Sequence, residues 1–509
     1  DVLDGLVDVM PAGVDALTEQ IRSNLVNAYK RSEVGPWGSL AVFSVESLLT
    51  DRAEPAESLT ASIVWSAGFL DADIDLDGRA VAAMLDGRRS EPAALVTGRP
   101  GAYLLRGSIV VPASETVSWM LVADTGLNQA DVRAAIDTAR STDAAQRVID
   151  DTRVGSRRLC ERLADADARQ STADPVADAH HLSNVLFNSM RGGVFPFGHL
   201  VPSADLTDFV IHRNRVVADR HAAWFNGLDA WVDVNDLRDA ADATGDADVV
   251  RLVLEYLPLT FSRRHGDPSR PWNRFSINVD DDAGNPLLEY EGNWRDIFQN
   301  WEALLHSYPA YFGHVVAKFV NATTIDGYNP YRISRNGIDW EVPDPDDPWS
   351  HIGYWGDHQI IYLLRLLEAW QQHEPGAIST WLTQPVFAYA DVPYLIADHD
   401  AIVRDPRDTI TFDEQHAAAI EQREARIGSD GRLLVGPDGA MLHVGLLEKL
   451  IVPALAKLTN LVPGGGIWLN TQRPEWNDAN NALAGPGLSM VTLCLLYTSP
   501  SPRDFSCNL

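Results

Sequence analysis

The stretch HIGYWGDHQIIYLLRLLEAW, residues 351–370, changes character halfway along. Its second half has the apolar spacing of an amphipathic helix. The apolar stripe consists of Ile360, Leu363, Leu364, Leu367 and Trp370. The residues before it crowd aromatic rings, two histidines and one carboxylate, Asp357, into a single loop. This stretch predicts a helix over 357–373 that packs against a core and begins at a polar, aromatic loop.

Helical spacing recurs through the second half of the chain. The other expected helices cover 217–228, 229–243, 247–259, 295–306, 309–321, 376–386, 412–427 and 443–459. Long loops separate many of these segments, and no motif repeats at a fixed spacing, which argues against a simple solenoid. Paired helices whose long loops build a site at one end are typical of a helical barrel or toroid.

The first part of the chain has a different pattern. After a helical start at 15–31, short β-branched or aromatic segments alternate with Gly, Pro and Asp turns. The expected strands lie within 39–49, 58–70, 93–98, 102–111 and 116–124. This spacing predicts an antiparallel β-sandwich domain at 1–125. Residues 126–175, rich in Ala, Arg and Asp, predict a solvated helical linker.

The two ends of the chain do not have the sequence of a natural protein's ends. The chain begins DVLDGL without Met, and the last residues, LLYTSPSPRDFSCNL at 495–509, resemble a read-through tail. We therefore expect a non-native tail at 495–509 on a fragment of a longer protein. The expected helical domain then covers 176–494 and is incomplete at its C-terminal end.

The charge and composition of the chain limit the classes of molecule that it is expected to bind. The chain has 509 residues, with 41 Lys and Arg against 71 Asp and Glu, and a formal net charge of -30. Such an excess of negative charge disfavours nucleic acid and anionic membrane surfaces. The three cysteines show no metal or disulfide spacing, and no long apolar run or signal peptide is present. We expect a cytoplasmic protein that needs neither nucleic acid nor a membrane.

Aromatic and carboxylate residues gather in three stretches. They are YEGNWRDIFQNWEALL (290–305), DPDDPWSHIGYWGDHQ (344–359) and GGGIWLNTQRPEWNDANNAL (464–483). Tryptophan faces stack on the C–H surfaces of sugars, while carboxylates and amides pair with sugar hydroxyls. The stretches therefore predict a saccharide partner. The alternative is that these tryptophans are core anchors.

Two carboxylates at helix starts could act either in the site or as helix caps. Asp296 lies in the first turn of the expected helix at 295–306, which favours its ionised form and suits a hydroxyl binder. Asp357 has the same position in its helix, but Trp349, Tyr354 and Trp355 can exclude water and raise its pKa, as a catalytic acid requires. Either residue can instead be a helix cap.

The remaining motifs carry less chemistry. WNDANNAL, residues 476–483, holds more amides than one helix cap can use. Gly464–Gly466 lacks the Lys and the spacing of a nucleotide loop, so we interpret it as a flexible turn. The histidines show no HExxH or comparable spacing, so no metal and no cofactor is expected.

In this order the three stretches resemble the family 94 glycoside phosphorylases, which include cellobiose and chitobiose phosphorylases. The family motif RDxxQD is similar to residues 295–300, WNDDH to 355–358, and DWND to 475–478. The resemblance implies a β-sandwich, a helical linker and an (α/α)6 barrel that is truncated here. The chain departs from the motifs at Asn300, where the family has an acid, and at Gly356, where it has Asn.

The resemblance also implies roles for individual residues. Asp357 is then the general acid that protonates the glycosidic oxygen, and Arg295 with Asp296 holds hydroxyls of the donor sugar. The other residues that the resemblance places in substrate binding are Trp355, His358, Trp476, Asn477 and Asn481. Asp478 would lie in a sugar-contacting loop at the barrel mouth.

Three functions remain open. An inverting phosphorylase needs one acid because phosphate is the nucleophile, whereas an inverting hydrolase also needs a base about 6.5–9.5 Å away. Asp478 or Glu475 could be that base. The leading expectation is phosphorolysis of a β-glucoside or disaccharide with inversion, with inorganic phosphate as co-substrate. The alternatives are an inverting (α/α)6 hydrolase and a non-catalytic sugar-binding relative. Formation of a homodimer is left open.

Overall fold

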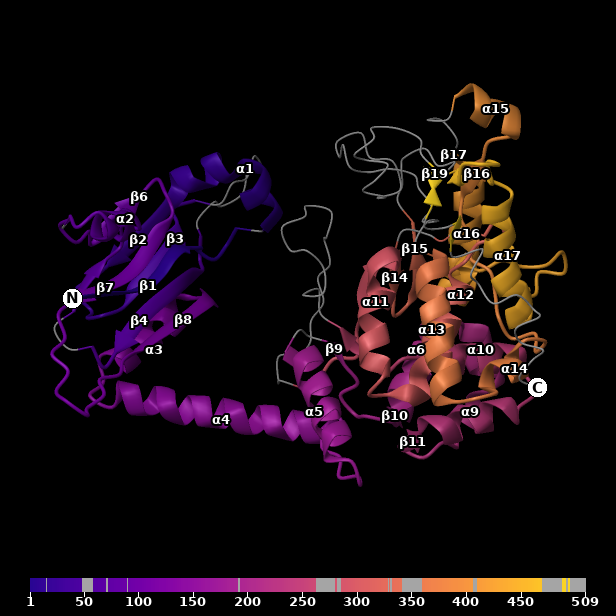
Figure 1. The fold of residues 1–509 in the computed structure, drawn as a ribbon, viewed down its shortest axis with the longest axis horizontal. Coiled ribbons are helices and arrows are strands. Elements are labelled where there is room, and N and C mark those ends of the chain that lie inside the picture. The colour runs from indigo at the N-terminus through magenta and orange to yellow at the C-terminus, as the bar shows by residue number, and fades with distance from the viewer. Residues whose placement is uncertain are drawn as a thin grey trace. The chain divides into compact units, whose positions relative to one another are not determined.

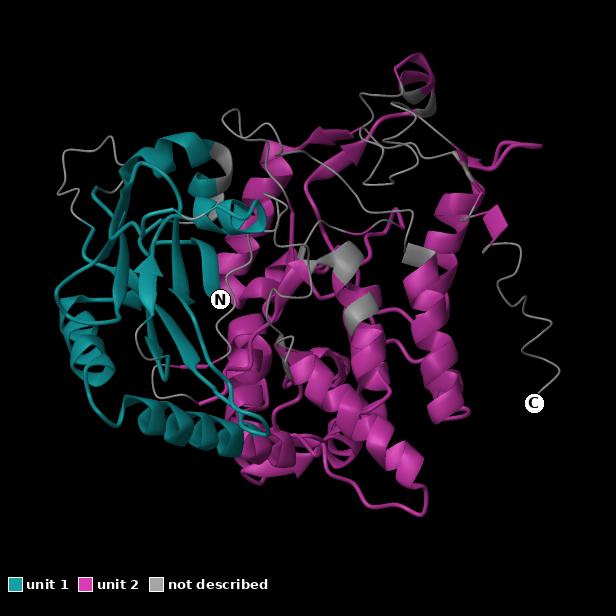
Figure 2. Cartoon of the chain, turned by 60° about the vertical axis from the view of Figure 1, so that its left-hand side comes forward, with its two compact units in different colours: residues 1–159 teal, residues 160–509 magenta. Residues whose placement is uncertain are grey.

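The computed structural model describes the chain apart from residues 15, 48–57, 70–71, 89, 191–192, 262–279, 282–284, 328, 330–331, 341–358, 406–409, 469–487, 491–492 and 495–509. The chain forms two compact units, unit 1 at residues 1–159 and unit 2 at residues 160–509 (Figure 2). Unit 1 contains most of the long strands, and unit 2 is mostly helical.

Unit 1 is built from two antiparallel sheets with helices around them (Figure 1). Its elements are β1 (Val2–Val9), α1 (Ala16–Tyr29), β2 (Lys30–Val34), β3 (Ala41–Val45), β4 (Ala61–Ala67), β5 (Asp73–Asp75), α2 (Arg79–Leu85), β6 (Leu95–Thr97), β7 (Gly101–Gly107), β8 (Met120–Leu127), α3 (Gln129–Ala139) and the start of α4 (Ala144–Asp165). The strand orders are β1-β7-β5 and β6-β2-β3-β4-β8.

The two sheets share one core because side chains alternate along their strands. Phe43 of β3 and Val64 of β4 face inward with Tyr103 of β7, from the other sheet. The Tyr103 hydroxyl donates to the Ser39 carbonyl oxygen at 2.6 Å. Trp65 points to the opposite face of its sheet, where α3 and the start of α4 cover it. The predicted antiparallel β structure is therefore present.

The sequence missed part of unit 1. All five expected strand segments contain strands, but β1, β2, β5 and α2 were not expected. The helix expected over 15–31 ends at Tyr29, because the chain from Lys30 pairs with β3, with Lys30 opposite Val45. Residues 126–175 contain the helices α3 and α4, and α4 continues past residue 159, where unit 1 ends. Their role as a linker between domains stays a prediction.

Unit 2 consists mainly of helices joined by short strand pairs. Its helices are α5 (Pro175–Met190), α6 (Ser203–Arg213), α7 (Arg215–Arg220), α8 (Ala222–Asn226), α9 (Val234–Asp242), α10 (Ala247–Glu255), α11 (Trp294–Leu305), η2 (Pro309–Tyr311), α12 (Phe312–Asn321), α13 (Gln359–His373), α14 (Ala377–Trp381), α15 (His399–Arg404), α16 (Glu414–Ile427), η3 (Ser429–Arg432) and α17 (Leu446–Leu458). Its strands are β9 (Gly193–Val194), β10 (Leu200–Pro202), β11 (Trp231–Asp233), β12 (Thr260–Phe261), β13 (Glu291–Asn293), β14 (Arg332–Ser334), β15 (Gly337–Asp339), β16 (Tyr394–Ile396), β17 (Ile410–Phe412), β18 (Ile467–Trp468) and β19 (Leu488–Ser489).

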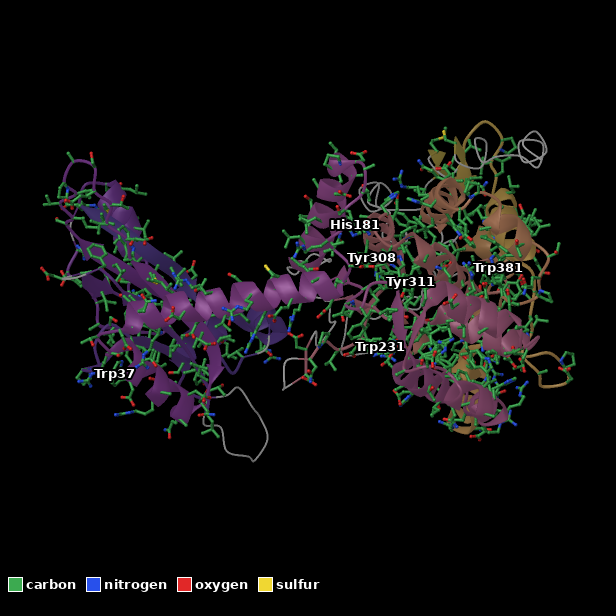
Figure 3. All side chains as sticks on the ribbon, turned by 90° about the horizontal axis from the view of Figure 1, so that it is seen from below. Trp37, His181, Trp231, Tyr308, Tyr311 and Trp381 are labelled. Carbon is green, nitrogen blue, oxygen red and sulfur yellow. The ribbon has the colours of Figure 1, made fainter. Side chains whose placement is uncertain are left out.

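Helices α11 and α12 form an antiparallel pair. Phe298, near the start of α11, contacts Phe319, near the end of α12, with ring centroids 4.6 Å apart. His306, just after α11, lies against Phe312 at the start of α12. A stack of aromatic rings continues this core: Tyr308 and Tyr311 lie close together in Figure 3, and the Tyr311 ring stacks on Phe195 at 4.2 Å.

The structure widens the predicted apolar stripe of α13. Leu363 and Trp370 are buried as expected, but Leu366 is more deeply buried than Leu364 and Leu367, which are only partly covered. The reason is that α13 packs against α11, α12, α14 and α17, so more than one stripe is covered. The helix expected over 217–228 is divided at His221 into α7 and α8. Closure into an (α/α)6 barrel stays a prediction.

No helix in the described part of the chain is both long enough and apolar enough to cross a membrane.

Replacing Phe298 with Ala should destabilise unit 2 by about 3–5 kcal/mol, because the side chain is completely buried between Trp301 and Phe319. Urea unfolding followed by tryptophan fluorescence measures the loss. Leu447→Ala on α17 is the control, since Leu447 is exposed and its loss should cost less than about 0.5 kcal/mol. Equal losses in the two variants would contradict the assigned core.

Candidate active site

The structure describes the helix starts that carry two of the predicted sites. Arg295 and Asp296 lie in the first turn of α11, as predicted, but their side chains are outside the described residues. The other predicted site residues lie outside the described residues altogether. They are Trp355, Asp357, His358, Glu475, Trp476, Asn477, Asp478 and Asn481.

Helices α11 and α13 run parallel and begin at the same end. Glu302 of α11 accepts hydrogen bonds from Arg365 of α13 at 2.9–3.0 Å. Further toward the C-terminal ends of the two helices, Nδ1 of His306 lies 3.3 Å from Nε2 of His373. At 1.5 Å per residue, α11 begins about 12 Å before Glu302 and α13 begins about 9 Å before Arg365. The chain therefore enters both helices at nearly the same level, with Asp357 two positions before α13.

The third predicted stretch is bracketed by a strand pair. Ile467 of β18 is paired with Ser489 of β19, and Trp468 with Leu488. The residues that enter and leave 469–487 are thus side by side. Figure 1 shows β19 in the upper part of unit 2, with β15 and then β14 below it.

A three-stranded sheet leads directly into α11. In the order β13-β14-β15, Glu291 pairs with Ser334 and Asn293 with Arg332, and Trp294 begins the helix. The Arg335 backbone N–H donates to the Tyr290 carbonyl oxygen at 2.9 Å. β13, which leads into α11, is therefore hydrogen-bonded to β14 and, through Tyr290, to the turn that joins β14 to β15.

Four buried charged groups, here called the charge ring, lie below this turn. Arg213 ends α6, Arg251 and Glu255 lie one turn apart on α10, and Asp430 lies in η3. Each side chain is at most 3% exposed. Arg213 contacts Glu255 at 2.5 Å and Asp430 at 3.0 Å. Arg251 contacts Glu255 at 3.1 Å and also pairs with Asp430, so each carboxylate bridges both arginines.

Two amides add further hydrogen bonds to the carboxylates of the charge ring. Asn321 of α12 donates to Glu255 at 2.8 Å, and Asn214 donates to Asp430 at 3.1 Å. Burial opposes ionisation of Glu255, but the nearby Arg213 and Arg251 guanidinium groups outweigh burial and lower the pKa of this carboxyl. The ring thus holds equal numbers of positive and negative charges.

The charge ring and Lys318 hold the β14–β15 turn. Arg213 Nη1 donates to the Asn336 carbonyl oxygen at 3.0 Å, and Lys318 Nζ donates to the Arg335 carbonyl oxygen at 3.0 Å. Gly337, at φ 139°, allows this approach, because a Cβ there would lie 2.7 Å from Arg213 Nη1. Burial, followed by repulsion from Arg213, lowers the pKa of Lys318 well below its usual value.

An open cavity of about 610 Å³ lies beside the same turn. Its lining residues are Phe197, Pro202, Asp205, Asp208, His212, 286–291 and 334–336. This volume is in the range of small-molecule sites. Four of the lining residues are carboxylates, and Arg335 is already paired with Asp205 at 2.8 Å. Carboxylates accept hydrogen bonds from hydroxyl groups, so the cavity suits a neutral polyhydroxyl ligand better than phosphate.

The sequence missed the charge ring and the cavity. Arg251 and Glu255 have the spacing of an ordinary surface ion pair on a helix, and nothing local links them to Asp430, 179 positions after Arg251.

Within the described ranges, no three His, Cys, Asp or Glu side chains gather as a metal site would require.

Replacing Asp430 with Asn should destabilise unit 2 by about 3–5 kcal/mol, because Arg213 and Arg251 would then share one buried carboxylate. Urea unfolding at pH 7 measures this. Glu424→Gln is the control: its partner is Arg432 at 3.0 Å and both are partly exposed, so the change should cost no more than about 1 kcal/mol. A cost for Asp430→Asn as small as the control's would contradict the charge ring's structural role.

His314 should make stability depend on pH. Burial, with a contribution from Arg238, lowers its pKa to about 4, while the unfolded value is 6.5. The unfolded chain therefore binds more protons between pH 6.5 and 4, and stability falls as the pH drops through that window. His314→Gln should reduce this slope by up to about 1.4 kcal/mol per pH unit. Unfolding free energies of the two proteins at several pH values measure it, and an unchanged slope in His314→Gln would contradict the burial of the His314 ring.

Comparison with known proteins gives one family match. Residues 197–258 match the model of glycoside hydrolase family 149 insertion domain 1. Among curated proteins the chain finds no match. Family 149 is related to the family 94 phosphorylases. The matched segment contains α6 to α10 and supplies three members of the charge ring, Arg213, Arg251 and Glu255. The match indicates a region of a carbohydrate-active enzyme.

Proposed function

We propose that this protein is a glycoside phosphorylase that cleaves a β-linked gluco-oligosaccharide with inversion. The match of residues 197–258 to a family 149 domain carries the proposal, because members of that family are β-1,3-glucan phosphorylases. It refines the family 94-like expectation, since it favours a β-1,3-linked oligosaccharide over a disaccharide.

The arrangement of α11 and α13 supports a shared site. Arg295 and Asp296 lie in the first turn of one helix, Asp357 precedes the other by two positions, and the two helices start at one level. Both helix N-termini favour negative charge, which suits Asp296 as an acceptor for donor-sugar hydroxyls. The segment between β18 and β19 would add Trp476, Asn477, Asp478 and Asn481 to the substrate contacts.

In the proposed reaction the Asp357 carboxyl donates its proton to the glycosidic oxygen. A phosphate oxygen attacks the anomeric carbon from the opposite face, and the bond between that carbon and the glycosidic oxygen breaks. The products are an α-sugar 1-phosphate and the shortened oligosaccharide with a free hydroxyl. Aromatic neighbours such as Trp355 would keep the acid protonated by excluding water, and His358 would contact the substrate.

The test is to incubate the purified protein with a β-1,3-linked gluco-oligosaccharide, with and without inorganic phosphate. We expect α-glucose 1-phosphate only when phosphate is added, detected by ³¹P NMR. Free glucose formed equally well without phosphate would instead establish hydrolysis, with Glu475 or Asp478 as the base. Binding of the oligosaccharide without either product would establish a non-catalytic role.

Asp357→Asn should lower kcat by about 10²–10⁴-fold, because the amide has no proton to give to the leaving oxygen. The far-UV circular dichroism spectrum should not change. Asp346→Asn is a matched control, since it removes another carboxylate of the same stretch. A full rate in Asp357→Asn, or an equal loss in Asp346→Asn, would remove Asp357 from the role of acid.

A further inference from the structure

The contacts around the β14–β15 turn form a continuous path from the matched segment to the start of α11. Arg213 and Lys318 hold the carbonyl oxygens of Asn336 and Arg335. Ser429 Oγ also donates to the Asn336 carbonyl oxygen. Three side chains from three different elements therefore fix two successive peptide groups of one short turn.

The path continues into β13. Arg335 donates from its backbone to Tyr290 and from its side chain to the Leu288 carbonyl oxygen. The Tyr290 ring lies 5.3 Å from Lys318 Nζ and is fully buried. Residue 291 then starts β13, which ends where α11 begins. Lys318 is thus linked to the first turn of α11 through the Arg335 carbonyl, the backbone hydrogen bond from Arg335 to Tyr290, and β13.

The charge ring itself has no room for a ligand. The cavity beside Arg213, Glu255, Lys318 and Gly337 measures about 10 Å³, which is about enough for one water molecule. The buried charges of the ring already face one another in pairs. Arg213 and Lys318 therefore act on the backbone of the turn and not on a bound substrate or phosphate.

We propose that Lys318 and Arg213 are positioning residues for the sugar-binding end of α11. Supported by the other members of the charge ring, they hold the β14–β15 turn. The turn holds β13, and β13 sets the position of the first turn of α11, where Arg295 and Asp296 lie. This inference rests on the proposed function, and it gives the family 149-like segment a role in holding the donor sugar through contacts that never touch it.

The test compares two buried lysines that each donate to a backbone carbonyl. Lys318 donates to Arg335, and Lys449 of α17 donates to Thr323 at 3.1 Å. Both are nearly inaccessible to solvent, and burial lowers the pKa of both. Lys318→Met and Lys449→Met therefore remove the same kind of group, but only the first change loosens the turn.

Hydrogen–deuterium exchange measures the turn directly and does not need activity. In Lys318→Met the amides of β13 and β14 should exchange at least about tenfold faster, whereas in Lys449→Met they should exchange as in the wild type. Ser429→Ala, which changes no charge, should increase the same exchange to a smaller extent. Unchanged exchange in Lys318→Met overturns the inference, whatever the activity.

Steady-state kinetics then test whether the turn affects binding of the sugar substrate. Loss of sugar contacts made equally in the ground and transition states raises KM and spares kcat. Lys318→Met should raise the KM for the oligosaccharide about tenfold and change kcat less than about threefold, and Lys449→Met should change neither. Faster exchange with an unchanged KM overturns the positioning role. If the wild type forms no product, the proposed function fails separately, and the calorimetric Kd for the same oligosaccharide replaces KM.

Discussion

Arg213, Arg251, Glu255 and Asp430 are buried together in unit 2, and much of the surrounding structure depends on how they meet. Removing one such ion from water costs several kcal/mol, and a single buried pair often fails to recover that cost. Here each charge contacts two of the opposite sign, and Asn214 and Asn321 satisfy further lone pairs. The favourable interactions exist only when α6, α10, α12 and η3 are all in place, so the charges couple these elements.

This coupling explains why a short turn can be held so firmly. A β-turn on a protein surface usually gains little from its own contacts. The β14–β15 turn instead receives donors from Arg213, Lys318 and Ser429, all of which are fixed by their own elements. The turn is paired with β13, the strand that leads into α11. The fixed positions of the buried charges therefore also restrict the start of α11, where Asp296 lies.

The local parts of the candidate site were accessible from sequence. The periodicity of 295–306 and 357–373 located α11 and α13 to within two residues at each end. The position of Asp296 in a first helical turn followed from that spacing. The direction of the two helices did not, because it rests on contacts such as those of His306 with His373, which are 67 positions apart. Short strands such as β13 and β14 were missed because three residues carry too little alternation to be recognised.

By itself, the sequence determined where most long helices and strands form, the strongly acidic surface, and the presence of three aromatic, carboxylate-rich stretches. These properties depend on near neighbours along the chain, where hydrophobic period and turn residues act directly. Only the tertiary structure decided that α11 and α13 start at one level, that four distant charges close into a ring, and that this ring holds the turn before α11. Each of these depends on pairing between residues far apart in sequence, and a charged residue has the same local pattern whether it faces water or a buried partner.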